Sequence, residues 1–211
     1  MLVSELVRAT SVPLATVKYY LREGLLPAGR KSSARTADYD DRHVRRLTLL
    51  RILRDVGAIP VARLRDLVEA VEDETLSVHG MFARATDALA PPTPPAGPRQ
   101  DEAQTLVADL LAGMGWSDVR PEAVDRANLT AVLEKLLSTD LFHVDARVLR
   151  FYADHADAIA RAEIAGLDEN AGRAGLLEQM VVGTVVFGEV LTILRRLAEE
   201  HHSRERFGDV H

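Results

Sequence analysis

The sequence predicts a mainly α-helical protein in which two helical parts are separated by a proline-rich segment. Apolar residues recur three, four and seven positions apart through most of the 211 residues, which is the period of a helix with one buried face. Five of the nine prolines fall between Pro91 and Pro98. The first 60 residues carry eleven Lys and Arg against six Asp and Glu, although the net charge of the chain is −6. This asymmetry indicates nucleic-acid contact by the basic part.

Each predicted helix follows from its own apolar stripe. The stripes lie within residues 14–23, 61–71, 106–114, 124–132 and 148–159. A longer helix, apolar on nearly all sides, is predicted for residues 176–202 and is typical of the middle of a bundle. Within the N-terminal part only residues 25–41 are predicted to be non-helical. Because proline cannot continue a helix, residues 90–100 are predicted to form a semi-rigid spacer of roughly 25 Å.

Several classes of protein are excluded by composition. The chain has no cysteine, so disulfides, thiolate metal sites and cysteine nucleophiles are ruled out. The start, MLVSELVRAT, has Glu5 inside its short apolar stretch and lacks the pattern of a signal peptide. No apolar run approaches the roughly 18 residues that a membrane helix needs. We therefore expect a soluble, cytoplasmic protein.

The stretch from Leu14 to Glu23 carries the first functional signal. As a helix ended by Gly24, it directs Tyr20 into the core and Tyr19 outward, since residues three, four and seven apart share a face. The outward face is formed by Ala15, Lys18, Tyr19 and Arg22. The preceding SELVRAT predicts a short helix and SVP a tight turn, which is the spacing of a helix-turn-helix. The basic loop that follows suits phosphate contact, and the alternative is an ordinary solvated charge run.

These residues resemble the MerR family of transcription regulators over roughly residues 2–90. The resemblance is carried by VSELVRATSVPLATVKYYLREGLL, by the basic loop after it, and by YDDRHVRRLTLLRILRDVGAIPVARLRDLV. It implies a winged helix-turn-helix in residues 1–74 and a dimerisation helix in residues 75–90 with Leu76, Phe82 and Leu89 at the interface. It also implies a homodimer that binds double-stranded promoter DNA and acts with RNA polymerase. Residues 91–100 are then the linker and residues 101–211 the effector-binding domain.

By position, the resemblance implies ten DNA-contacting residues. They are Thr16, Lys18, Tyr19 and Arg22 on the recognition helix, Arg30, Lys31 and Arg35 in the first wing, Tyr39 at its close, and Arg42 and Arg45 at the start of the third helix. Two positions depart from the family. Ala15 stands where an arginine usually reads a base, and Arg35, Thr36 and Ala37 replace a Gly-Tyr-Arg. The departures affect base reading, whereas the phosphate contacts, which position a protein without reading sequence, are mostly retained.

The C-terminal part, residues 101–211, resembles the helical ligand-binding bundles of other bacterial regulators. We expect an apolar pocket for a hydrophobic or cationic organic effector. The candidate ligand-binding residues are Trp116, Phe151, Tyr152, His155, Phe187 and Glu189, with Glu189 as the partner of a cationic group. The alternative is that the aromatic residues are simply core. No metal and no cofactor are predicted, because His143, His155, His201 and His202 show no recognisable ligand spacing.

Two other functions stay open at this point. One is a DNA-architectural or partner-binding regulator without a small-molecule ligand. The other is an enzyme in the C-terminal bundle, which we do not expect, because the sequence has no glycine-rich phosphate loop, no nucleophile motif and no carboxylate–histidine metal spacing. An internal cavity would favour effector sensing, and a fully packed bundle would favour the architectural role.

Overall fold

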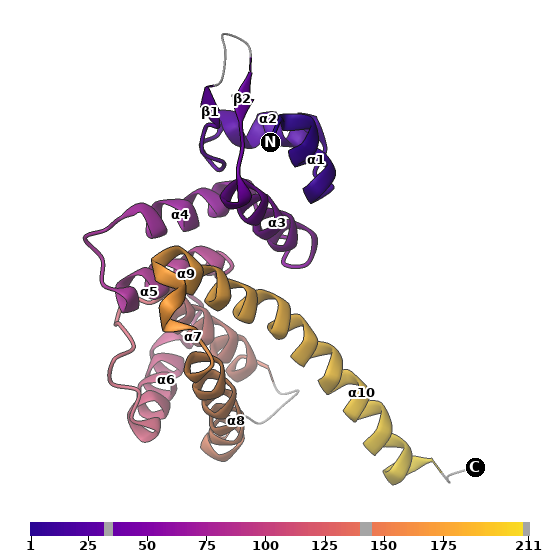
Figure 1. Cartoon of the computed structure of the whole chain (residues 1–211). Coiled ribbons are helices and arrows are strands. Elements are labelled where there is room, and N and C mark those ends of the chain that lie inside the picture. Colours follow the sequence, from indigo (N-terminus) through magenta and orange to yellow (C-terminus); the bar gives the residue numbers. More distant parts are fainter. Residues whose placement is uncertain (32–35, 140–144, 209–211) are drawn as a thin grey trace. The chain divides into compact units, whose positions relative to one another are not determined.

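The computed structural model describes residues 1–31, 36–139 and 145–208, and it confirms a mainly α-helical protein (Figure 1). The chain forms two compact units. Unit 1 combines Met1–Leu76 with Asn170–His211, and unit 2 is Ser77–Glu169. Unit 2 is therefore inserted into the sequence of unit 1 and is joined to it by two chain connections.

The N-terminal part of unit 1 has the predicted order of helices and wing. It consists of α1 (Val3–Thr10), α2 (Leu14–Arg22), β1 (Arg30–Lys31), β2 (Ala37–Asp38), α3 (Asp41–Asp55) and α4 (Val61–Glu72). The predicted helix from Leu14 is confirmed, and Gly24 just beyond it has φ of +72°, a conformation that glycine adopts without steric cost. The interior of this part is apolar and includes Leu6, Val17, Tyr20, Leu47 and Leu64, each no more than 1% exposed.

The last helices of the chain also belong to unit 1. A short 3₁₀ turn, η1 (Glu169–Ala171), leads into α9 (Gly172–Val182), a π-helical turn η2 (Gly183–Phe187) and α10 (Gly188–Phe207). Helix α9 contacts α3 and α4. Its residues Leu177, Met180 and Val181 are buried. Thus α9 completes the core of the unit that carries the helix-turn-helix.

Arg173 at the start of α9 fixes this packing through the end of α4. Its guanidinium donates hydrogen bonds to four backbone carbonyl oxygens, those of Ala70, Val71, Asp73 and Leu76, at 2.7 to 3.3 Å. The last carbonyls of a helix have no partner within the helix. A side chain 100 residues further along the sequence supplies the missing donors here.

Unit 2 contains α5 (Val78–Leu89), α6 (Gln100–Met114), α7 (Val124–Leu137) and α8 (Ala146–Ala165). Ala103, Val107 and Leu133 form a buried cluster against which further leucines of α6, α7 and α8 pack. In α5, the side chains of Met81, Ala85 and Ala88 are buried.

The proline-rich segment is packed against α7 within unit 2. Asn128 donates a 3.1 Å hydrogen bond to the carbonyl of Pro91, and the backbone N–H of Arg99 lies 3.4 Å from Oε1 of Glu134. Gly97 lies so close to the Glu134 carboxylate that an added Cβ would overlap it. The segment is non-helical, as predicted, but it is not a free spacer between two domains. The proline content predicted that the backbone of this segment is non-helical. Its packing depends on side chains of α7, about 35 residues further along the sequence, which composition does not indicate.

The compact units also divide the chain differently from the predicted boundaries. The division falls after Leu76 and before Asn170, not at residues 91–100. The reason is that α9 contacts α3 and α4, while Asp87 of α5 bonds Arg120 and the backbone N–H of Val124 in unit 2. The functional assignments of these segments, as DNA-binding, dimerisation and effector-binding parts, stay predictions.

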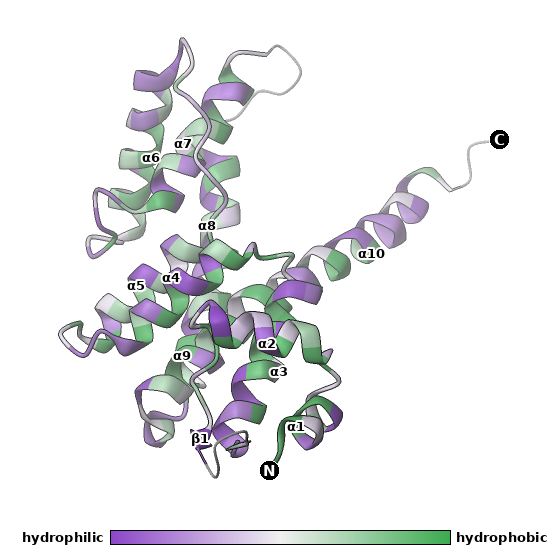
Figure 2. Ribbon diagram, turned by 90° about the horizontal axis from the view of Figure 1, so that it is seen from above, coloured by the Kyte–Doolittle hydropathy of each residue, from purple (hydrophilic) through white to green (hydrophobic). Residues whose placement is uncertain are grey.

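The helix predicted for residues 176–202 is present, but its second half is not buried. In α10 no residue is buried, and Figure 2 shows apolar and polar residues alternating along it. The segment Glu169–Phe207 contains an 18-residue window with a mean hydropathy of 1.6, so it is long and apolar enough to cross a membrane by length and composition only. The expectation that no segment passes this test was wrong, because Glu178 and Glu189 interrupt the apolar run without lowering its average enough.

Candidate nucleic-acid interface

The turn between α1 and α2 is held by specific hydrogen bonds. Thr10 ends α1 with its hydroxyl donating to the carbonyl of Leu6 at 2.8 Å, and Ser11 has φ of +55°. The side chain of Val12, within the turn, is buried. Arg51 of α3 donates to the carbonyl of Thr10 at 2.8 Å. The angle between the two helices is therefore fixed by α3, as a helix-turn-helix requires.

The outer face of α2 presents two cations beside a tyrosine. Lys18 and Arg22 are exposed, Tyr19 is half-buried, and Tyr20 is 1% exposed. The predicted orientation of the two tyrosines is thus confirmed. The Arg22 guanidinium lies 5.2 Å from the centroid of the Tyr19 ring, a cation–π distance. Thr16, half-buried, completes the predicted set on this helix.

Arg22 is not neutralised by its acidic neighbour. Nε of Arg22 lies 3.4 Å from Oε1 of Glu23, but the other oxygen of that carboxylate accepts a 2.8 Å bond from Arg65 of α4. The side chain of Arg22 is 71% exposed. Two arginines share one carboxylate, so this edge of the unit has a net positive charge.

The first wing is a short hairpin beside α2 (Figure 1). β1 and β2 pair antiparallel with Arg30 opposite Asp38 and Lys31 opposite Ala37, and both cations are exposed. Gly29 permits the close approach of the two strands of the hairpin, because a Cβ there would lie 2.8 Å from the carbonyl oxygen of Asp38. Arg35, also predicted for this wing, lies outside the described residues.

Tyr39 closes the wing but is a core residue. It is 9% exposed and its ring packs edge-on against His43 with centroids 5.1 Å apart. Its backbone exchanges two hydrogen bonds with Met1, at 2.7 and 2.8 Å. The structure therefore gives Tyr39 a packing role at the base of the wing, and its burial does not support the predicted contact of its ring with DNA.

Helix α3 starts at an Asp40–His43 cap that the sequence analysis missed. Asp40 accepts hydrogen bonds from the backbone N–H groups of Arg42 and His43, and Nδ1 of His43 lies 2.7 Å from its Oδ1. These bonds, with that of the His43 ring first, lower the pKa of Asp40 below its ordinary value of 3.8. The signal was the acidic residue three positions before a hydrogen-bonding side chain, with histidine in the place of the usual Glu or Gln. The cap orients Arg42 and Arg45, both exposed.

Arg46, the next cation on α3, has a structural place instead. It donates to the carbonyl of Leu25 at 3.1 Å and lies 3.9 Å from Glu72 of α4. Burial lowers the pKa of its guanidinium, and the nearby charges of Glu72 and Glu178 oppose the change. Arg46 therefore holds the residues that follow α2 against α3 and α4.

The predicted effector residues do not form one pocket within a unit. Phe151, Tyr152 and His155 lie together on α8, with the His155 ring 4.3 Å from that of Phe151, but all three are exposed. Phe187 and Glu189 belong to unit 1 and are also exposed.

Trp116 is the predicted residue that lines a pocket. The pocket is in unit 2, has a volume of about 410 Å³, and lies among α5, the residues after α6 and the start of α7. Trp116 and Val119 give it an apolar wall. The charged residues that line it are Asp87, Asp118, Asp125, Arg120 and Arg126, so the carboxylates exceed the guanidinium groups by one. The indole Nε1 donates to Asp157 of α8 at 3.0 Å, which holds the ring in place.

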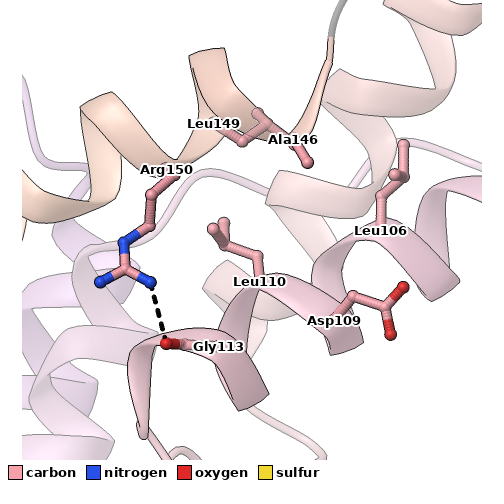
Figure 3. A pocket seen from close by; sticks show the side chains of 7 residues that line it. All are labelled: Leu106, Asp109, Leu110, Gly113, Ala146, Leu149 and Arg150. Carbon is pink, nitrogen blue, oxygen red and sulfur yellow. Dashed lines mark hydrogen bonds between the residues drawn. The ribbon is translucent and has the colours of Figure 1, made fainter.

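A second pocket of about 260 Å³ lies between α6 and α8 (Figure 3). Leu106, Leu110 and Leu149 point into it, and Arg150 closes one end with a 3.0 Å hydrogen bond to the carbonyl of Gly113. Its volume is below the roughly 300 Å³ at which sites for drug-sized ligands begin. The pocket around Trp116 is therefore the better candidate for an effector site.

The histidines of α10 differ from expectation. In the described part of the chain, His201, His202 and Glu205 place their ligand atoms within 4.8 Å of one another. Both rings lie near Glu205, at 3.5 and 2.8 Å, on an exposed helix surface. The spacing that the sequence analysis did not recognise is that of residues three and four apart on a helix.

Comparisons with known proteins agree with this geometry. Residues 1–71 match the family described as MerR HTH family regulatory protein. A solved structure, entitled "Crystal structure of the putative transcriptional regulator SCO5550 from Streptomyces coelicolor A3(2)", is 32% identical, with 100% of each chain covered and a TM-score of 0.74. No curated protein matches the chain. The helix-turn-helix held by α3, the basic wing and these similarities show that the chain belongs to the MerR family of transcription regulators.

Proposed function

We propose that this DNA-binding regulator acts as a cytoplasmic homodimer that binds promoter DNA and responds to an organic ligand. The observation that carries the proposal is the set of exposed cations on three successive elements: Lys18 and Arg22 on α2, Lys31 in the wing, and Arg42 and Arg45 on α3. DNA is recognised first through its phosphates, which such cations neutralise. In the family, RNA polymerase is the further partner at the promoter, and we propose a role in binding rather than in catalysis.

The DNA contact can be tested without knowing the operator, because phosphate contacts are independent of sequence. A random 30-base-pair duplex is titrated with the protein at several salt concentrations, and log K is plotted against log salt. Removing one phosphate contact flattens the slope by about 0.9. We expect this change for Lys18→Ala and for Arg22→Ala. Lys135→Ala removes an exposed cation of α7 and serves as the matched control, with an unchanged slope. Unchanged slopes for both α2 variants would refute the assignment of this helix face.

Three features of the Trp116 pocket support the proposed effector response. Its volume lies in the range of small-molecule sites, its wall is aromatic and apolar, and three aspartates line it. Aromatic faces and carboxylates together attract organic cations. Asp87 is held by Arg120 at 2.6 Å and by the N–H of Val124, and Asp125 accepts a 3.5 Å hydrogen bond from Asn128, so Asp118 is the better partner for a ligand charge.

The sole tryptophan of the chain makes binding directly observable. Tetraphenylphosphonium is titrated while the fluorescence of Trp116 is followed, with triphenylphosphine oxide as the neutral probe. We expect the cation to quench the signal in a saturable manner, and Asp118→Asn to weaken this binding. Equal binding of the neutral probe would remove the aspartates from the site. If neither probe binds, and neither stabilises the fold thermally, this effector proposal fails while the DNA contact stands.

A further inference from the structure

A pocket within unit 1 lies among the residues after α2, the start of α3, the end of α4 and the first turns of α9. Its volume is about 560 Å³, within the range of small-molecule sites. It shares no lining residue with the pocket around Trp116. It is therefore a separate cavity, and it belongs to the unit that carries the helix-turn-helix.

The positive charge of this unit 1 pocket comes from α3. Arg42, Arg45 and Arg46 all line it, because residues three and four apart on a helix share a face. The carboxylates of Glu72 and Glu178 line it as well. Three guanidinium groups exceed two carboxylates by one, so the pocket has a net charge of +1 and favours an anionic ligand.

The two carboxylates act on Arg46. Its Nη2 lies 3.9 Å from Oε1 of Glu72, and the charges of Glu72 and Glu178 oppose the lowering of its pKa by burial. Arg46 also donates a hydrogen bond to a backbone carbonyl. Arg42 and Arg45, by contrast, are exposed, and within the described part of the chain neither of their side chains has an ion pair or a hydrogen bond. These are the two guanidinium groups that can bind a ligand.

The remaining wall of the pocket is apolar and made of small side chains. It is formed by Pro27, Val71, Ala171 and Ala174, while Gly175 adds no side chain. Such a wall suits the apolar body of an organic molecule. Arginine binds carboxylate and phosphate groups through paired hydrogen bonds. Because the net charge of the pocket is only +1, a carboxylate with one negative charge fits it better than a phosphate monoester with about two.

We propose that this pocket binds a small organic carboxylate, whose charged group contacts Arg42 and Arg45 and whose apolar body packs against the wall formed by α4 and α9. The same two arginines are among the cations proposed to contact DNA phosphates. A carboxylate in the pocket occupies groups that DNA uses, and it therefore weakens DNA binding. The site differs in place and in charge preference from the one proposed around Trp116. Only its effect on DNA rests on the proposed DNA contact.

The test is isothermal titration calorimetry of the full chain with naphthalene-2-carboxylate. Naphthalene-2-carboxamide has the same shape without the charge and is the matched neutral probe. We expect the carboxylate to bind in a saturable manner and the amide at least about tenfold more weakly, because hydrogen bonds to a charged group are stronger than those to a neutral one. Equal binding of the two probes, or no binding of the carboxylate to the wild type, would overturn the inference.

Two variants locate the binding in this pocket. Ala174 is exposed, lines the pocket and is not among the predicted DNA contacts, so Ala174→Phe fills the site and leaves the cations of α3 in place. We expect carboxylate binding to weaken at least about tenfold, since the ring takes up space in which the ligand buries its surface. Ala198→Phe, at an exposed position of α10, is the matched control and should bind as wild type does.

Arg45→Gln is the second variant, at an exposed position where a change of side chain does not disturb the core. It should also weaken binding of the carboxylate, and circular dichroism checks that every variant is folded. Carboxylate binding that is as strong in Arg45→Gln and in folded Ala174→Phe as in wild type lies elsewhere in the molecule, and the inference is then wrong.

The effect on DNA is measured with the random 30-base-pair duplex. Saturating naphthalene-2-carboxylate should flatten the slope of log K against log salt by about 0.9 for each arginine that it occupies. Sodium acetate at the same concentration controls for ionic strength, and in Ala174→Phe the carboxylate should leave the slope unchanged. Binding of the carboxylate without any change in the wild-type slope would refute the competition with DNA. Failure of the DNA contact itself is read separately, from Lys18→Ala and Arg22→Ala without the probe.

Discussion

Replacing Arg173 by methionine tests how strongly α9 is attached to the DNA-binding part. Methionine keeps much of the aliphatic length and removes all donors to the carbonyls of Ala70, Val71, Asp73 and Leu76. A hydrogen bond from a charged group contributes about 1.5–3 kcal/mol, and the two shortest bonds here are 2.7 Å. Some of the freed carbonyls regain water, so we expect a loss of about 3 kcal/mol, not the sum over four bonds.

Because the chain has two compact units, one global unfolding free energy would not isolate this effect. Hydrogen exchange measured by mass spectrometry reports α9 alone. A loss of about 3 kcal/mol predicts roughly 100-fold faster exchange of the α9 amides. The exchange rate of the α9 amides in Arg173→Lys should fall between those of wild type and Arg173→Met, because an ammonium cannot reach all four carbonyl oxygens at once. Arg147→Met, whose side chain is 94% exposed, is the control. Exchange of α9 within threefold of wild type in Arg173→Met would refute the reasoning.

Three further predictions concern the wing, the α3 cap and unit 2. Gly29→Ala should weaken binding of random DNA by displacing β1, because its Cβ would lie 2.8 Å from a β2 carbonyl, whereas Gly113→Ala, where nothing lies within 4 Å, should not. Asp40→Asn keeps a side chain that can cap α3 but removes its charge. In urea denaturation at neutral pH, the wild type should be more stable than this variant. The difference should disappear as the pH falls through the lowered pKa of Asp40, below 3.8. Leu133→Ala should lower the free energy of unfolding of unit 2, measured by urea denaturation, by about 2–5 kcal/mol. Val132→Ala, at an exposed position, should change it by no more than about 0.5 kcal/mol.

Much of the local structure could be predicted because it is coded by neighbours in the sequence. The apolar spacing around Val17 and Tyr20 sets the buried face of α2, and Gly24 ends the helix through its own backbone freedom. The exposed cations of the interface follow from the same periodicity, since Lys18 and Arg22 are four apart. Their contacts with DNA are still a prediction, because a spacing gives a face and not its ligand.

What could not be predicted depends on contacts between distant segments. Nothing near Arg173 in the sequence indicates that its guanidinium caps α4, about 100 residues earlier. The apolar character of residues 176–202 was correct, but periodicity cannot tell a helix buried in its own chain from one that awaits a partner. α9 has buried apolar residues in its own unit, whereas no residue of α10 is buried. Tyr39 was assigned by position in the family, and only the structure showed that its ring packs against His43.

The Arg173 contacts also constrain how a ligand in unit 2 can affect DNA binding. Unit 2 joins unit 1 at Leu76 and again at Asn170, and the guanidinium of Arg173 bonds the carbonyls of Asp73 and Leu76. Both connections are thus tied at one point, beside the end of α4. If unit 2 binds the proposed effector, we expect a change there to reach the recognition helix along the chain connections at Leu76 and Asn170, because α4 and α9 both belong to the core of unit 1. Coupling between two such sites is typically about 1–3 kcal/mol and acts equally in both directions.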